Sequence, residues 1–215
     1  MKVVIRMPKT IREVVAAYDI SAPLYDLMNQ VYFFGGDKRF RSTLAERLIL
    51  KPGDAVLDLC CGTGLDFPFL LKKIKIQGTL LGVDLSSEML QQAKKKIGSE
   101  VVNLVRSDAS HLPLRDKTFD AILVSFCLKI TPTYEKTIEE AARVLKPAGR
   151  IGILANNKPS GPLWLPGIIL TKVLSAMVKI DFEINLKEHL SKKFIIIEDR
   201  KMHGGLVRFL VGKMR

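Results

Sequence analysis

The stretch that decides the fold is Ala55-Val56-Leu57-Asp58-Leu59-Cys60-Cys61-Gly62-Thr63-Gly64. An apolar run here contains an acidic residue near its end, and a glycine-bearing turn follows before a predicted helix. α/β proteins use a buried strand that leads through such a turn to a helix N-terminus to bind nucleotide-like cofactors. A second apolar run, 79–83, ends in Asp84. Together the two runs predict a site for an adenosine-bearing cofactor.

The whole chain predicts one domain. Its 215 residues are enough for a sizeable core, and 47% hydrophobic with 26% charged residues is typical of a globular protein. Neither a repeat nor a Ser/Gly-rich linker marks a boundary. Within the domain we expect a helical cap (1–50), a cofactor-binding core (51–155), a substrate-side insertion (156–191) and two last strands (192–215).

The net charge of +12 and the pI near 9.7 raise the question of an anionic partner. The lysine runs at 72–73, 94–96 and 192–193 fall at the ends or outer faces of predicted elements. A solvated face explains them, and attraction to acidic lipid is the alternative. They do not form a patch typical of nucleic-acid binding, so no nucleic acid is favoured as partner.

Cysteine usage predicts reduced, buried, intracellular thiols. Cys60, Cys61 and Cys127 lie on or beside apolar runs, are too few for a disulfide framework and form no CxxC metal motif. The N-terminus lacks an apolar run long enough for a signal peptide. We therefore expect a cytoplasmic protein, with a peripheral position on the inner face of the membrane as an extension, and no metal site.

Strands and helices alternate through most of the chain. Residues 10–50 read as helical, with apolar and aromatic positions at helical spacing that could also act as a lid. Strands are predicted at 55–59, 80–84, 101–106, 119–126 and 150–155, and helices at 65–73, 88–97 and 134–145. This alternation predicts a Rossmann-like, mostly parallel sheet with helices on both faces.

Residues 156–191 interrupt this alternation. The predicted helix Ile168–Lys179 has a wide apolar face but is too short to span a bilayer. It could cover the site, lie in a membrane interface, or pack as an ordinary core helix. Two strand-like runs, 194–198 and 206–211, close the chain and predict an antiparallel pair at the sheet edge.

The acidic residues at the strand ends suggest the chemistry of the cofactor. Phe67 stands where the dinucleotide fingerprint has its third glycine, which spoils the expected pyrophosphate site. Gly62 and Gly64 let a ligand approach the backbone closely. Asp58 could face an ammonium group and Asp84 the two ribose hydroxyls. Asp108-Ala109 could offer a carboxylate and an apolar wall to adenine.

With these residues in place, the chain resembles the class I S-adenosylmethionine-dependent methyltransferases over nearly its whole length. The family's D-x-G-x-G-x-G loop appears as 58–64, with Cys60 in place of the first glycine. Leu112-Pro113-Leu114, Phe119-Asp120-Ala121-Ile122 and 145–150 are similar to later signatures of the family. The resemblance implies S-adenosylmethionine as cofactor and a seven-stranded sheet whose last strand is antiparallel.

Two narrower resemblances concern the acceptor. Residues 18–29 and Gly204-Gly205-Leu206-Val207 are similar to the ubiquinone/menaquinone biosynthesis C-methyltransferases. Residues 177–182 look more like phospholipid N-methyltransferases. Both groups act on membrane-resident amphiphiles. The predicted cofactor-binding residues are Tyr25, Asp58, Cys60, Gly62, Gly64, Asp84, Leu85, Met89, Asp108, Ala109 and Ser125.

Methyl transfer from a sulfonium needs alignment and exclusion of water, and neither a metal nor a covalent nucleophile. The weak candidates for a catalytic base are Tyr25 and His203, with His111 as a further loop histidine. The leading hypothesis is a methyltransferase for a lipophilic small molecule, a quinol-like carbon or a phospholipid amine. A methyltransferase for protein, tRNA or a polar metabolite and a non-catalytic cofactor-binding protein stay open, as does the oligomeric state.

Overall fold

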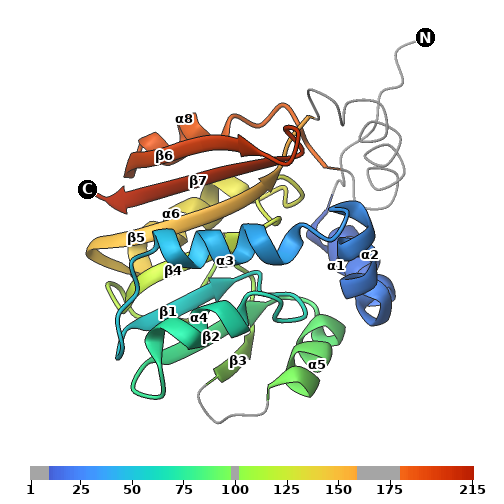
Figure 1. The fold of residues 1–215 in the computed structure, drawn as a ribbon, viewed down its shortest axis with the longest axis horizontal. Coiled ribbons are helices and arrows are strands. Elements are labelled where there is room, and N and C mark those ends of the chain that lie inside the picture. The colour runs from blue at the N-terminus through green and yellow to red at the C-terminus, as the bar shows by residue number, and fades with distance from the viewer. Residues whose placement is uncertain (1–9, 98–101, 159–179) are drawn as a thin grey trace.

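The computed structural model describes residues 10–97, 102–158 and 180–215. Within these ranges the chain forms a seven-stranded sheet in the order β3-β2-β1-β4-β5-β7-β6 (Figure 1). The strands are β1 (Ala55–Leu59), β2 (Thr79–Asp84), β3 (Val102–Arg106), β4 (Phe119–Ser125), β5 (Leu145–Asn156), β6 (Phe194–Met202) and β7 (Val207–Met214). The helices are α1 (Ile11–Ser21), η1 (Ala22–Leu24), α2 (Tyr25–Tyr32), α3 (Asp37–Arg47), α4 (Phe67–Ile74), α5 (Ser87–Lys96), α6 (Tyr134–Val144) and α8 (Leu186–Ser191).

The strand directions confirm the predicted fold class. Strands β1 to β5 pair in parallel. Strand β7 lies between β5 and β6 and is antiparallel to both, so the last strand runs against the rest of the sheet. The order reverses at β1, where the chain leaves toward β2 and β3 on one side and returns through β4 on the other. In such sheets, ligands bind at this switch point, beyond the carboxyl ends of the strands.

Alternate residues of the central strands pack into two different cores. Val56 and Leu123 join a cluster with α3 and α4, whereas Leu57 and Val124 join a cluster with α6 and α8. Figure 1 shows α3 and α4 in front of the sheet and α6 and α8 behind it. Because side chains alternate along a strand, each buried strand supplies both cores. This is why the strands read as continuous apolar runs in the sequence.

Several element boundaries differ from the sequence prediction, and three of the differences have a clear local cause. Helix α4 begins at Phe67 rather than Leu65, because the tight turn continues to Asp66 and Pro68 suits the first helical turn. Strand β4 ends at Ser125, since Phe126 has a left-handed φ of 59°. Strand β5 begins at Leu145, which pairs with Phe119, so residues 146–149, which lie between the predicted helix and the predicted strand, form a bulge within the strand.

The N-terminal residues form helices, as predicted, and α1 and α2 lie beside the carboxyl ends of the parallel strands (Figure 1). No residue of α1 is buried, whereas α3 buries Phe40 and Leu44 against the sheet. The predicted helix Ile168–Lys179 falls outside the described residues. Among the helices that the structure describes, none has the length and apolar character that crossing a membrane requires.

Candidate functional site

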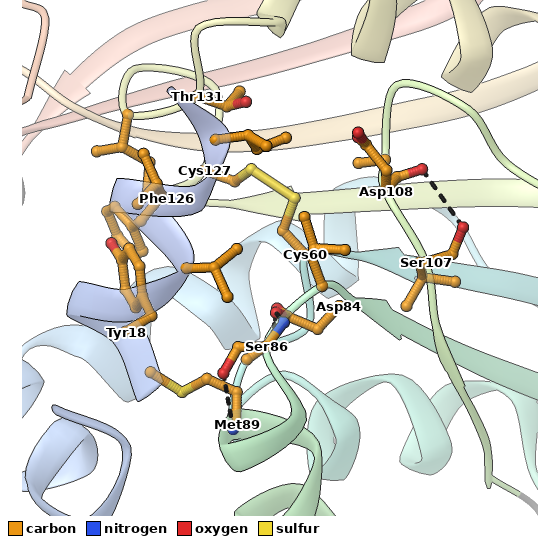
Figure 2. A pocket seen from close by; sticks show the side chains of 18 of the residues that line it. Tyr18, Cys60, Asp84, Ser86, Met89, Ser107, Asp108, Phe126, Cys127 and Thr131 are labelled. Atoms are coloured by element: carbon orange, nitrogen blue, oxygen red, sulfur yellow. Dashed lines mark hydrogen bonds between the residues drawn. A yellow bond between two sulfur atoms is a disulfide. The ribbon is translucent and has the colours of Figure 1, made fainter. Parts of the chain in front are cut away.

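A pocket opens at the carboxyl ends of β1, β2 and β4, and we call it the strand-end pocket. Its walls come from these strand ends, the loop after β3 and helix α1, and Figure 2 shows part of this lining. The lining residues are Ile11, Val14, Val15, Tyr18, Tyr25, Cys60, Gly62, Val83, Asp84, Leu85, Ser86, Met89, Ser107, Asp108, Ala109, Ser125, Phe126, Cys127, Ile130 and Thr131. Nine of the eleven residues predicted for the cofactor are among them; Asp58 and Gly64 are not.

Asp84 joins the glycine-bearing loop to the start of α5. One carboxylate oxygen accepts the backbone N–H of Gly62 at 2.8 Å, and the other accepts that of Ser86 at 2.9 Å. Burial raises the pKa of Asp84, and the N–H groups of Ser86, Gly62 and Leu85 oppose this by favouring the carboxylate. Asp84 therefore shapes the loop while its carboxylate remains on the pocket wall.

The loop itself relies on left-handed backbone conformations. Cys60, Gly62 and Gly64 have φ values of 60°, 53° and 75°. A Cβ on Gly62 would meet nothing closer than the Tyr25 ring at 3.9 Å, so this backbone is open to a ligand. A Cβ on Gly64 would lie 2.5 Å from the Phe67 ring. Gly64 is thus needed to pack Phe67, and it lines a separate hollow beside α4 instead of the strand-end pocket.

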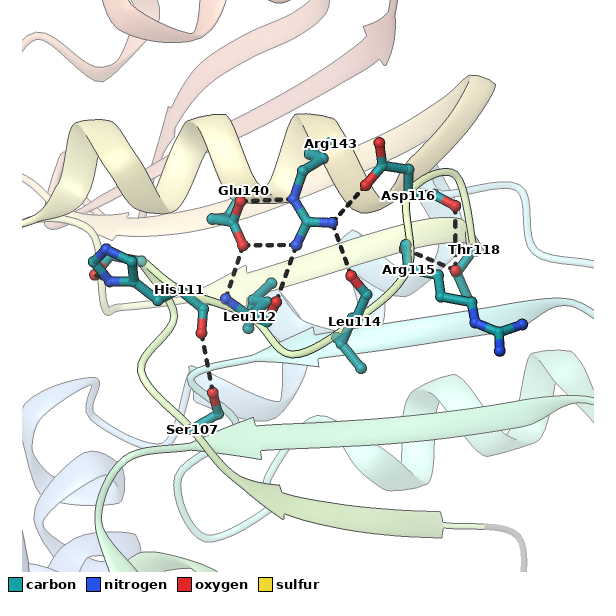
Figure 3. A network of polar contacts seen from close by, with 10 residues as sticks. Ser107, His111, Leu112, Leu114, Arg115, Asp116, Thr118, Glu140 and Arg143 are labelled. Carbon is teal, nitrogen blue, oxygen red and sulfur yellow. Dashed lines mark hydrogen bonds and ion pairs between the residues drawn. The ribbon is translucent and has the colours of Figure 1, made fainter.

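Asp108 and Ala109 lie in the loop after β3, which a polar network attaches to α6 (Figure 3). Arg143 donates to Glu140 and Asp116 and to the backbone carbonyls of Leu112 and Leu114. Because the planar guanidinium of Arg143 donates to acceptors on both α6 and the loop, it attaches the loop to the helix. Asp108 also accepts hydrogen bonds from the N–H and hydroxyl of Ser110, both at 2.8 Å.

Helices α1 and α2 close the other side of the strand-end pocket. Ser86 donates its hydroxyl to Asp19 at 2.5 Å, and Thr63 donates to Asp26 at 2.5 Å. Lys96 of α5 forms an ion pair with the same Asp26. These contacts connect the N-terminal helices to the loops after β1 and β2. Apolar residues of α1 line the pocket, although none of them is buried.

The structure places the candidate bases in three different settings. Tyr25 lines the pocket in an edge-to-face contact with Tyr18, with ring centroids 5.8 Å apart. Desolvation by the surrounding pocket walls is the main cause that raises the pKa of both phenols, so both stay protonated near neutral pH. His203 packs against Phe34 and Phe40 and is absent from the strand-end pocket, and burial lowers its pKa. His111 is 70% exposed.

Asp58 lies behind the pocket wall instead of on it. It points to the same face of β1 as Val56, is fully buried, and neither carboxylate oxygen has a hydrogen-bond partner. Burial, then the charges of Asp66 and Asp84, raises its pKa well above the ordinary value, and Arg41 opposes the shift. The predicted direct contact with an ammonium group therefore finds no support in the geometry of this residue.

We expect Asp58→Asn to stabilise the fold increasingly as the pH rises. An acid whose folded pKa is raised stabilises the protein below its unfolded pKa, about 3.9, and loses that contribution toward its folded pKa. The variant and the wild type should thus unfold alike near about pH 4, and the variant should gain about 1 kcal/mol or more by about pH 7. Urea unfolding at both pH values measures this; a pH-independent difference would contradict it.

The cysteines correct one sequence prediction. Cys60 and Cys127, 67 residues apart, form a disulfide in the wall of the strand-end pocket (Figure 2), and only Cys61 among the three is a free, buried thiol. The prediction of three reduced thiols was wrong because sequence spacing does not show that the loop after β4 lies against the loop after β1. The bond links these two loops at the pocket.

We expect one thiol per denatured chain to react with a maleimide before reduction and all three after it. Opening a loop of 67 residues removes up to about 4 kcal/mol of stability in the chain-entropy model. Cys127→Ala should lose roughly 2–4 kcal/mol, and reductant should destabilise this variant no further. A wild type whose unfolding is insensitive to reductant would contradict the bond.

A second pocket adjoins the first and is lined mainly by apolar and aromatic groups; we call it the aromatic pocket. It lies between α1, α2 and the carboxyl ends of β4 and β5, and its volume is about 250 Å³. Its lining residues are Ala17, Tyr18, Ile20, Ser21, Tyr25, Met28, Asn29, Tyr32, Phe33, Phe126, Ile130, Asn156 and Ile180. Tyr18, Tyr25, Phe126 and Ile130 line both pockets, so the two pockets are adjacent.

Sequence reasoning missed the segment 126–131 as part of the site. Phe126, Cys127, Ile130 and Thr131 line the strand-end pocket, and Phe126 has the left-handed backbone that turns the chain into it. The position of this segment, directly after a parallel strand next to β1, was the available signal. The contribution of α1 had only a weak signal in its apolar spacing.

Comparison with known proteins agrees with this geometry. The model of the ubiE/COQ5 methyltransferase family matches residues 7–166. A demethylmenaquinone methyltransferase of Lactobacillus johnsonii is 38% identical over 146 residues, which are 66% of this chain and 60% of that protein. That of Lactiplantibacillus plantarum is 36% identical over 153 residues, 69% of this chain and 65% of that protein. The chain thus spans less than two thirds of these relatives.

A solved structure shows the same fold. The crystal structure of a SAM-dependent methyltransferase from Aquifex aeolicus superposes with a TM-score of 0.65 at 21% identity, covering 88% of this chain and 98% of that one. The family match spans the core and the N-terminal helices and confirms the resemblance to the quinone-biosynthesis methyltransferases. The segment that resembled phospholipid methyltransferases, 177–182, lies beyond this match, and its first half lies outside the described residues. This chain belongs to the ubiE/COQ5 methyltransferase family.

Proposed function

We propose that this protein binds S-adenosylmethionine in the strand-end pocket and methylates a ring carbon of a quinol-type acceptor in the aromatic pocket. The observation that carries the proposal is the adjacency of the two pockets, which share Tyr18, Tyr25, Phe126 and Ile130 as lining residues. A transfer between two bound molecules requires adjoining sites with the reacting atoms in contact. The names of the relatives, demethylmenaquinone methyltransferases, support a quinone-type acceptor.

The residues of the strand-end pocket fit the proposed cofactor. The open side of Gly62 leaves room against the backbone, because even a Cβ at this position would lie 3.9 Å from the Tyr25 ring. Asp84 would accept hydrogen bonds from the ribose hydroxyls, and Asp108 with Ala109 would hold adenine. Tyr25 would cover the methionine end. When bound, S-adenosylmethionine supplies a methyl group that is already activated for transfer.

The protein's task in this reaction is alignment and exclusion of water. Bound S-adenosylmethionine would supply the methyl group and keep the electrons of the broken carbon–sulfur bond, while the acceptor would give the electron pair of its ring carbon and lose the ring proton to solvent. The apolar walls shared by the two pockets keep water from the transfer path. Because burial keeps Tyr18 and Tyr25 protonated, neither phenol is assigned as the base.

The reaction is tested with methyl-labelled S-adenosylmethionine and a reduced demethylmenaquinone in detergent under anaerobic conditions. We expect label in the extracted quinone. Parallel reactions offer tRNA and total protein, and label appearing only there would support the alternative acceptors. Cofactor binding by calorimetry without transfer to any acceptor would support a non-catalytic role.

We also propose that the N-terminal helices contact the membrane that holds the acceptor. Ile20, Leu24, Leu27, Val31 and Phe34 are exposed by 53–84%, and all lie within 15 residues of each other along α1, η1, α2 and the turn that follows. Ile20 also lines the aromatic pocket, so one of these exposed side chains adjoins the proposed acceptor site. Contiguous exposed apolar side chains are typical of interaction surfaces. The net charge of +12 adds attraction to anionic lipid.

Co-sedimentation with vesicles of phosphatidylglycerol and phosphatidylcholine tests this contact. We expect Leu27→Glu to weaken binding about tenfold, because a Leu side chain is no longer buried in lipid and a charge is added. Ile76→Glu is the matched control: Ile76 is 80% exposed but precedes the amino end of β2, at the opposite end of the sheet. Equal binding by the two variants would reject this surface.

A further inference from the structure

The disulfide between Cys60 and Cys127 lies in the wall of the proposed cofactor site. Both residues line the strand-end pocket, and Figure 2 shows the bond among the side chains of that lining. Cys60 is half-buried and Cys127 is 8% exposed. A small thiol that enters the pocket can therefore reach the bond. Accessible disulfides are the labile, regulatory ones, whereas structural disulfides resist reduction.

The backbone at Cys60 suits a glycine better than a cysteine. Its φ of 60° lies in the left-handed region, where a side chain costs free energy that glycine avoids. Cys60 also stands at the position of the first glycine in the D-x-G-x-G-x-G loop that the chain resembles. What the cysteine adds at this position is the bond to Cys127, so the bond itself accounts for the residue.

The bond joins two loops that have separate hydrogen-bonded anchors. In the loop after β1, the N–H of Cys61 donates to the carbonyl of Val83 at 3.0 Å. In the segment 126–131, the N–H of Phe126 donates to the carbonyl of Leu154 at 2.7 Å. Reduction would leave each loop attached to its own neighbouring strand and remove the covalent link between the two parts of the pocket wall.

We infer that Cys60 and Cys127 form a redox site that sets the affinity of the strand-end pocket for its cofactor, an inference that rests on the proposed function. A dithiol reductant breaks the Sγ–Sγ bond: two electrons and two protons pass to the protein, which leaves two thiols on it and a disulfide on the reductant. The released segment must then be ordered when the cofactor binds, which costs affinity. By linkage, bound cofactor favours the disulfide by the same factor.

Calorimetry with S-adenosylmethionine compares the oxidised protein with protein kept reduced by dithiothreitol. We expect reduction to weaken binding about tenfold, because loop and side-chain ordering is added to the cost of binding. Cys127→Ala should bind alike in both conditions. Cys61→Ala is the matched control, because Cys61 adjoins Cys60 in the chain but is a free, buried thiol that does not line the pocket. This variant should keep the tenfold response. Circular dichroism checks that each form is folded.

The reciprocal effect gives a second readout that needs only the wild type. The protein is equilibrated in mixtures of oxidised and reduced dithiothreitol, with and without saturating S-adenosylmethionine, and its thiols are counted by maleimide labelling. We expect the cofactor to raise the ratio of oxidised to reduced protein about tenfold. Equal affinities and an unshifted ratio would overturn the inference and leave the proposed function intact. Absence of binding in both forms would reject the proposed cofactor and the inference with it.

Discussion

Asp84→Ala is expected to weaken binding of S-adenosylmethionine by at least about a hundredfold. Two hydrogen bonds from ribose hydroxyls to a charged acceptor contribute about 1.5 kcal/mol or more each, and every 1.4 kcal/mol is tenfold in affinity. The substitution also removes the acceptor for the N–H groups of Gly62 and Ser86, at 2.8 and 2.9 Å, so the loop after β1 loses its connection to α5. Isothermal titration of each variant with the cofactor measures the effect.

Two further variants separate the local effect from a change in charge. Asp84→Asn keeps one oxygen for a backbone N–H, so its loss of affinity should be smaller than that of alanine. Glu46→Ala removes one negative charge from the exposed surface of α3 and should bind like the wild type. If Asp84→Ala bound the cofactor as tightly as Glu46→Ala, the strand-end pocket would not be the cofactor site.

Local sequence patterns predicted the pocket residues that lie at the carboxyl ends of the parallel strands. A strand that ends at a glycine-bearing turn places Gly62 by itself, and a second strand that ends in an acid places Asp84 beside it, because parallel neighbours end at the same sheet edge. Asp108 and Ala109 follow from the same rule, and the alternation of elements predicts the mostly parallel sheet around them.

The features that the sequence did not predict depend on side-chain contacts between different elements. Asp58 was expected in the pocket, but strand alternation turns it toward α3 and α4, where Arg41 lies nearby. Gly64 was expected to meet the ligand, but the Phe67 ring occupies the space beside it. The disulfide joins loops 67 residues apart. In each case the determining neighbour lies on another element, and periodicity carries no information about it.

Arg41→Ala is expected to lower the free energy of unfolding by about 3–5 kcal/mol, the usual cost of leaving a buried charge uncompensated. Arg41 donates to Asp66 across 25 positions of sequence, and the two side chains are 4% and 3% exposed. The guanidinium also lies 5.4 Å from the centroid of the Phe126 ring. It is the cation that opposes the raised pKa of Asp58 and Asp66, so its removal leaves two buried carboxyl groups.

The expected fall in melting temperature is about 2–4 °C for each kcal/mol in a chain of this size. Arg41→Met combined with Asp66→Leu is the matched control, because it replaces the ion pair by apolar groups and removes one of the two carboxyl groups that Arg41 compensates, so it should recover part of the loss. The free energy of unfolding of Arg41→Ala should also approach that of the wild type toward low pH. Protonation of Asp58 and Asp66 removes the two negative charges that Arg41 no longer compensates. A double variant no more stable than Arg41→Ala, at any pH, would show that Arg41 acts through packing on Phe126 rather than through its charge.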